Sequence, residues 1–235
     1  MTTIASDAPE STNRWRDSRW LILAEFAVFA LIWFADVYHW HHVIKINKTL
    51  YLLVLGWASL RIRGMRWKDI GFQVYRTWPR TIAIGVLCGV GIEAMELFIT
   101  QPLLVRLTHK WPNLAEFAAL RWNWKLLALA LLFTWTLAAI GEEFVYRGYL
   151  MNRVADLFGR TRLAWILSLV VVSVIFGFAH IYQGVTGVTE NAIDGFILGL
   201  MYLRCDRKLS VPIIAHGITD TVDFLLIFMG KYPGM

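Results

Sequence analysis

Long apolar runs separated by short polar segments constrain the fold of this chain more than any other feature of its sequence. A helix needs about 20 mainly apolar residues to cross the hydrocarbon core of a bilayer. Seven segments approach this length, at residues 20–40, 43–60, 81–104, 124–147, 163–181, 188–203 and 209–229. Because backbone groups in lipid must be satisfied within helices or closed barrels, we expect an all-α polytopic transmembrane helix bundle of about seven spans.

The composition is also that of a membrane protein. Hydrophobic residues make up 57% of the chain and charged residues only 17%, which lies outside the range of an ordinary soluble domain. The net charge of +6 is interpreted as a signal of membrane orientation. No Lys/Arg-rich run is interleaved with exposed aromatic residues as a nucleic-acid surface requires. We therefore expect contacts with membrane lipids and none with nucleic acid.

The distribution of Lys and Arg predicts the orientation in the membrane. With seven spans and a cytoplasmic N-terminus, the inside segments hold fifteen of these residues and the outside segments hold seven, which follows the positive-inside rule. One span too many or too few would reverse every later segment. We expect an integral protein of a bacterial cytoplasmic membrane, with a disordered cytoplasmic tail at residues 1–19 and a single membrane domain at 20–235. The first apolar run begins only at Trp20, so a cleavable signal peptide is not predicted.

Ionisable residues inside the apolar segments are costly to bury, and they therefore indicate a functional site within a polar intramembrane cavity. They gather in three places along the chain, and these residues are Glu142, Glu143, Arg147, His180, His216 and Asp220. Glu143 and Arg147 are four residues apart and can pair, which leaves Glu142 free on a neighbouring helix face. His216 and Asp220 have the same spacing, so both can point into one cavity.

Glu142 and His180 are predicted to meet across a helical hairpin. Apolar residues recur at helical spacing after Arg147, so the fourth helix is expected to continue to Phe158 before a tight turn at Gly159–Arg162. Glu142 and His180 then both lie about 27 Å from the turn, at about 1.5 Å per residue. The polar stretch Tyr182–Asp194 would line the cavity beside them, where irregular backbone is tolerated at membrane depth.

A glutamate, two histidines and an aspartate that converge in a dry pocket suit hydrolysis of an acyl bond. A carboxylate can activate water while imidazoles stabilise the developing oxyanion. The same four side chains could hold zinc. The HExxH pattern of zinc proteases is absent, so a metal ranks second and no cofactor is expected.

Other ionisable residues and the cysteines have plainer interpretations. Glu93 and Glu96 could extend the cavity or bind substrate, although a helix face that meets the polar interior is the alternative. Asp36 with His39, His41 and His42 is interpreted as a wet interface at a helix end rather than as a metal site. Cys88 and Cys205 lie far apart without CxxC spacing, which favours inert packing.

At these residues the chain resembles the CAAX prenyl protease and bacteriocin-processing family of membrane proteins, also called the Abi family. Three motifs of that family occur in order: EExxxR at Glu142–Arg147, FxxxH at Phe176–His180 and HxxxN/D at His216–Asp220. The likeness covers residues 126–229, and the preceding part matches only as generic membrane helices. It implies a metal-independent intramembrane glutamate endopeptidase that cuts a peptide or a lipidated, for example prenylated, protein near the cytoplasmic side.

The resemblance also implies a role for each residue of the motifs. Glu142 would be the general base on water, and His180 would help to hold or deprotonate that water. His216 and Asp220 match the oxyanion-stabilising end, while Glu143 and Arg147 would give structural support. Asp220 stands where the family's eukaryotic proteases carry Asn. A carboxylate donates to an oxyanion only when protonated, so Asp220 either carries a proton or orients His216.

Two other functions are compatible with the same residues. A non-catalytic immunity or scaffold protein of this family could use the polar cluster to hold a partner, because fold and motif do not settle activity. A transporter would also bury carboxylates and histidines. Such proteins carry internal repeats, and we find none in this chain, whose oligomeric state does not follow from its sequence.

Overall fold

The computed structural model describes residues 18–38 and 47–235, and the described residues contain helices but no strand. The helices are α1 (Arg19–Val37), α2 (Lys48–Ile62), α3 (Trp78–Met95), α4 (Gln101–Thr108), α5 (Trp124–Phe133), α6 (Met151–Leu157), α7 (Arg162–Phe178), α8 (Gly184–Arg204) and α9 (Ser210–Phe228). Two π-helical segments, Glu96–Thr100 and Thr134–Leu150, join α3 to α4 and α5 to α6. Short 3-10 turns lie at Trp67–Ile70, Ala115–Leu120 and Ile181–Gln183. The all-α prediction is confirmed.

Each of the seven predicted apolar segments contains a helix. Among the described residues, three helical stretches are long and apolar enough to cross a membrane: Trp78–Thr108, Trp124–Leu157 and Ser210–Phe228. The pair α7 and α8, bent by 58° at the break between them, makes a fourth if it is taken as one broken span. The polytopic helix bundle is thus confirmed, and the count of seven spans stays a prediction.

The fourth predicted helix continues past Arg147 as expected. It ends at Leu157, and a turn follows in which Gly159 and Arg160 have φ values of 75° and 55°. Of the predicted disordered tail at residues 1–19, only Ser18 and Arg19 are described, and Arg19 begins α1. The three histidines of the predicted wet interface, His39, His41 and His42, lie outside the described residues.

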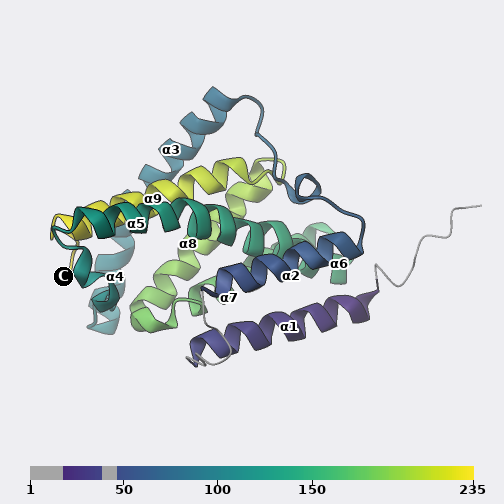
Figure 1. Ribbon diagram of the computed structural model, residues 1–235, viewed down its shortest axis with the longest axis horizontal. Coiled ribbons are helices and arrows are strands. Elements are labelled where there is room, and N and C mark those ends of the chain that lie inside the picture. Colours follow the sequence, from purple (N-terminus) through teal and green to yellow (C-terminus); the bar gives the residue numbers. More distant parts are fainter. Residues whose placement is uncertain (1–17, 39–46) are drawn as a thin grey trace, which may run out of the picture.

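The segments rich in basic residues come together at one end of the bundle, which we call the basic end. Arg63 at the end of α2 pairs with Glu25 of α1, with 2.5 Å between Nη1 and Oε1. The guanidinium groups of Arg160 and Arg207 lie 5.0 and 5.1 Å from the ring of Trp165. In Figure 1 this end is at the right, with α6 and the end of α2.

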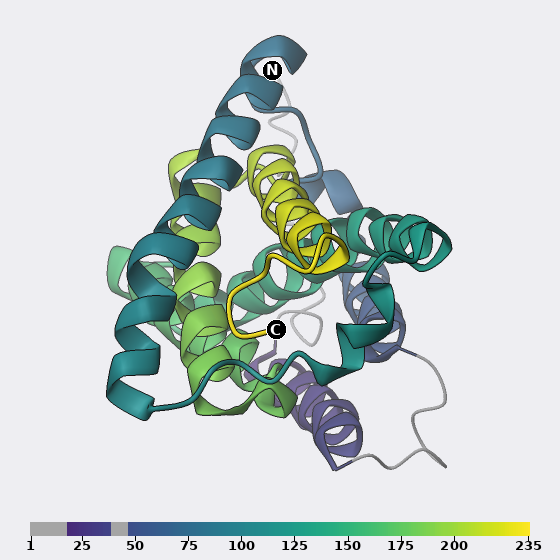
Figure 2. The same ribbon diagram turned by 90° about the vertical axis from the view of Figure 1, so that its left-hand side faces the viewer.

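The connections between the other helix ends lie at the opposite end of the bundle, which we call the distal end. Asn113 N donates to Gln183 O at 2.9 Å, and Trp122 N donates to Phe228 O at 3.0 Å. This end, with α4 and the C-terminal residues, is at the left of Figure 1 and faces the viewer in Figure 2. The chain therefore alternates between two ends that differ in their content of basic residues.

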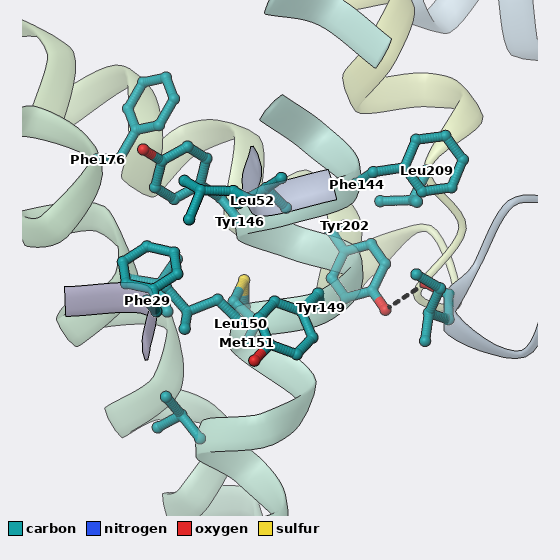
Figure 3. Close-up of a cluster of buried hydrophobic side chains, with 14 of the residues drawn as sticks. Phe29, Leu52, Phe144, Tyr146, Tyr149, Leu150, Met151, Phe176, Tyr202 and Leu209 are labelled. Atoms are coloured by element: carbon teal, nitrogen blue, oxygen red, sulfur yellow. Dashed lines mark hydrogen bonds between the residues drawn. The ribbon is translucent and has the colours of Figure 1, made fainter. Parts of the chain in front are cut away.

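The hydrophobic core surrounds the segment Thr134–Leu150. Buried side chains from this segment and its continuation meet residues of five other helices, α1, α2, α7, α8 and α9, and of the connection before α9. Figure 3 shows Phe29, Leu52, Phe144, Tyr146, Tyr149, Leu150, Met151, Phe176, Tyr202 and Leu209 of this core. The Tyr202 hydroxyl donates to Ile70 O at 3.0 Å (Figure 3). It also accepts from Asn152 Nδ2 at 3.0 Å. The segment that carries the EExxxR motif is therefore held on several sides.

Close packing of α7 on α8 depends on Gly177, three residues before His180. A Cβ at this position would lie 2.4 Å from Val188 O and 2.7 Å from the Ala192 Cβ. Small residues that let backbones approach are the usual means by which membrane helices pack. We expect Gly177→Ala to destabilise the protein by about 1–3 kcal/mol, as overpacked substitutions do, measured by denaturant unfolding in mixed micelles.

Gly91 in α3 offers a matched control, because no atom lies within 4 Å of a Cβ built there. Gly91→Ala should stabilise the protein by about 0.5–1 kcal/mol, since Ala loses less backbone entropy than Gly in a helix. Equal effects of the two substitutions would show that the α7–α8 contact is not tight.

Candidate active site

A cavity of about 370 Å³ collects the ionisable residues that the sequence singled out. Glu142, His180, His216 and Asp220 all line it. They come from the segment Thr134–Leu150, from the break after α7 and from α9. The structure thus brings together three motifs that are distant in the sequence, as predicted, and their catalytic roles stay predictions.

Glu143 is fully buried and connects the first motif to the last. Arg147 Nη1 donates to Glu143 Oε1 at 2.7 Å, so the predicted ion pair is present. The same oxygen lies 3.0 Å from His216 Nδ1. This second contact was not predicted, because spacing within one helix cannot reveal a partner on another. An ionised carboxylate only accepts hydrogen bonds, so the His216 Nδ1 donates and its ring orientation is fixed.

Arg147 also holds the surrounding helices in place. Its Nη2 donates to Gly195 O of α8 at 2.9 Å, and its guanidinium lies 4.6 Å from the centre of the Phe176 ring in α7. The side chain is only 1% exposed. Arg147 therefore joins three helices around Glu143, and this arrangement fits the supporting role that the family resemblance implies for it.

Asp220 stands on the other side of His216. Its Oδ1 lies 3.6 Å from His216 Nε2, which is longer than a hydrogen bond. Both side chains line the cavity, as their spacing predicts. At this separation Asp220 acts on the ring through its charge, and a small movement would be needed for direct contact.

His180 lies at the break between α7 and α8, outside regular helix. Its Nδ1 is 3.0 Å from Phe176 O. A carbonyl oxygen only accepts, so Nδ1 carries a proton and the neutral ring keeps Nε2 as a proton acceptor. The Phe176 ring packs against both histidines, with ring centres 5.1 Å from His180 and 6.0 Å from His216. The phenylalanine of the FxxxH motif therefore spaces the two imidazoles.

The backbone that carries Glu142 is wider than an α-helix. Thr134–Leu150 is π-helical over 17 residues, and Met151 N accordingly donates to Tyr146 O. π-Helical segments are rare and concentrate at functional sites. The predicted distance of 27 Å between Glu142 and the turn assumed α-helical rise and does not apply to this segment. We find no residue pattern that would have predicted the wider helix.

Four further acidic residues line the cavity: Glu96, Glu190, Asp194 and Asp223. The prediction that the stretch Tyr182–Asp194 lines a cavity is confirmed, since five of its residues do so: Tyr182, Gln183, Glu190, Asn191 and Asp194. Glu96 extends the cavity, which was one of its two predicted roles. Asp223 was missed, although its position three residues after Asp220 places it on the same helix face.

The zinc alternative was tested against the positions of the side chains. Among residues 18–38 and 47–235, no three His, Cys, Asp or Glu side chains are placed so that they could hold one metal ion. The four motif residues thus line one cavity without forming a ready ligand set. That the protein uses no cofactor stays an expectation.

A segment in the second half of the chain matches a known family. Residues 123–222 match the family described as type II CAAX prenyl endopeptidase Rce1-like. The matched segment contains all three motifs, from Glu142 to Asp220, so the predicted resemblance is confirmed over this segment. No curated protein and no solved structure matches the chain.

Proposed function

We propose that this integral membrane protein, which carries an Rce1-like domain at residues 123–222, is a glutamate endopeptidase that hydrolyses a peptide bond within the membrane. Its substrate is a peptide or a lipidated protein. The observation that carries the proposal is that Glu142, His180, His216 and Asp220 line a single cavity among apolar helices. A prenyl group on the substrate is compatible with the family match.

In the first step, Glu142 takes a proton from water. The water oxygen forms a bond to the carbonyl carbon of the substrate, and the carbonyl oxygen becomes an oxyanion. His180 Nε2, left as an acceptor by the contact between Nδ1 and Phe176 O, holds the same water. A positioned base of this kind contributes about 10²–10⁴ in rate.

His216 stabilises the oxyanion from the opposite side. Its Nδ1 is occupied by Glu143, so only Nε2 can donate into the cavity, and it does so in the doubly protonated ring. The carboxylates of Glu143 and Asp220 offset the charge of that ring. In the second step the C–N bond breaks, and the proton on Glu142 passes to the leaving nitrogen.

The proposal is tested by comparing membrane peptides from cells that produce the wild type or Glu142→Gln. A new peptide terminus that forms only with the wild type identifies both the reaction and its substrate. If the two samples contain the same termini and a bound partner is recovered with both proteins, the chain is an immunity or scaffold protein instead.

We also propose that the basic end faces the cytoplasm of a bacterial cell, because basic residues concentrate in cytoplasmic connections. The cavity extends toward the distal end, where Asn47, Pro112, Tyr182 and Tyr232 line it. Cleavage would then occur toward the non-cytoplasmic face. This differs from the cytoplasmic-side cleavage expected from the sequence. If the N-terminus and the basic end face the cytoplasm, the part of the cavity at the distal end lies toward the opposite face of the membrane.

The orientation can be measured with single cysteines at Lys68 and Glu116, which are exposed near the basic and the distal end. In a background with Cys88→Ser and Cys205→Ser, a membrane-impermeant maleimide should label Glu116→Cys in spheroplasts. It should label Lys68→Cys only after permeabilisation. The reverse pattern would place the N-terminus outside and the cavity toward the cytoplasm.

A further inference from the structure

The cavity has a second part, formed by Glu96, Glu190, Asp194 and Asp223, which we call the acidic compartment. These side chains come from the π-helical segment before α4, from α8 and from α9, and all four line the cavity. Asp223 follows His216 by seven residues on α9, about 10 Å along the helix axis. The acidic compartment therefore lies beside the proposed reaction centre, toward the distal end.

Glu190 is a buried carboxylate of the acidic compartment with an oxygen that makes no hydrogen bond to the described residues. Its side chain is only 3% exposed, and its Oε1 has no hydrogen-bond partner in the described part of the chain. Asp223 Oδ1 is likewise buried without a partner there. No Lys or Arg occurs among the described residues that line the cavity. Buried carboxylates are normally paired with a cation because their desolvation is otherwise costly.

Glu96 is held in a fixed orientation by other polar groups. The Tyr232 hydroxyl donates to Glu96 Oε1 at 3.4 Å and accepts from Gln101 Nε2 at 3.0 Å. Burial, together with the nearby Asp223, raises the pKa of Tyr232, so its hydroxyl keeps its proton. The carboxyl group of Asp194 lies against Glu96. Support of this kind is typical of a binding site, where the contacting groups are positioned by a second layer of residues.

We propose that the acidic compartment binds a basic side chain of the substrate, the ammonium of Lys or the guanidinium of Arg. An extended peptide covers about 3.3 Å per residue. The separation of about 10 Å between His216 and Asp223 along α9 thus corresponds to about three residues of peptide. The basic residue lies within that distance of the bond that is cut. As a statement about cleavage, this inference rests on the proposed function.

A basic side chain fits the acidic compartment better than a metal ion does. The described residues provide no set of three side chains placed around one ion. The carboxylates come from three helical segments around the cavity. A long side chain with several N–H donors can reach such groups individually, and hydrogen bonds to charged groups are the stronger ones.

A binding experiment tests the proposal independently of cleavage. Full-length Glu142→Gln protein in nanodiscs is titrated with acetyl-Leu-Leu-Lys-Leu-Leu-amide and with the same peptide carrying norleucine in place of Lys. We expect the Lys peptide to bind about tenfold more tightly. Adding Glu190→Gln or Asp223→Asn should remove this preference, whereas adding Glu116→Gln, at an exposed position, should preserve it.

Equal binding of the two peptides would overturn the proposal. So would a preference that survives both Glu190→Gln and Asp223→Asn. Stabilisation by Ca²⁺ or Mn²⁺ without any preference for Lys would overturn it in favour of a metal site.

Cleavage of a mixed peptide library separates this proposal from the proposed function. With wild-type protein, Lys and Arg should be enriched within three residues of the cut bonds, and Glu190→Gln should remove the enrichment. Cleavage without enrichment contradicts the proposal that the acidic compartment binds a basic side chain, and it leaves the proposed peptidase function standing. Selective binding of the Lys peptide without any cleavage by the wild type supports the acidic compartment and contradicts the peptidase.

Discussion

Glu142→Gln is expected to lower the rate of peptide cleavage by at least about a hundredfold and to leave the fold intact. A positioned general base contributes about 10²–10⁴ in rate, and an amide of the same shape cannot accept the proton of water. Glu142 lines the cavity and is half-buried, so its replacement by Gln removes charge without creating a void. The measurement is the initial cleavage rate of the substrate found by terminus mapping, with purified protein in nanodiscs.

Two companion variants make this result specific. Glu116→Gln makes the same chemical change at an exposed position and should cleave like the wild type. Thermal unfolding of Glu142→Gln should match that of the wild type within a few degrees. If Glu142→Gln cleaves at the wild-type rate, the assignment of the general base is wrong, even though the family match still holds.

The helices and the site motifs were predictable from the sequence because both depend on local spacing. Apolar length located the helices, and the i,i+4 spacing of Glu143 and Arg147 predicted their ion pair. The cavity itself followed from the cost of burying six ionisable residues in apolar segments. Such costs act on each segment separately, so they can be estimated without knowing how the segments pack.

Contacts between helices were not predictable in the same way. The bond between Glu143 and His216 joins residues 73 positions apart, and the bond between Tyr232 and Glu96 joins residues 136 apart. Which helix faces meet depends on close approach at residues such as Gly177 and on the π-helical turns that rotate Glu142 and Glu96. Periodicity measured along one helix contains no information about these rotations.

Arg147→Met is expected to destabilise the protein by about 3–5 kcal/mol, because it removes the guanidinium paired with the buried Glu143 carboxylate and leaves His216 Nδ1 as the remaining donor to that oxygen. Glu143 is 0% exposed and Arg147 is 1% exposed, so water cannot replace the guanidinium. The substitution also removes the donor to Gly195 O and the contact with the Phe176 ring. The free energy of unfolding is measured by denaturant titration in mixed micelles.

Adding Glu143→Gln to Arg147→Met should recover part of this loss, since a neutral amide is less costly to bury than an unpaired carboxylate. The coupling energy between the two sites should be about 0.5–3 kcal/mol. Arg66→Met is the control, because Arg66 is 69% exposed and lies 3.9 Å from Asp69; such surface pairs contribute about 0–1 kcal/mol. Equal losses for Arg66→Met and Arg147→Met would mean that water reaches Glu143. In that case the contacts of Arg147 with three helices would not be what stabilises the site.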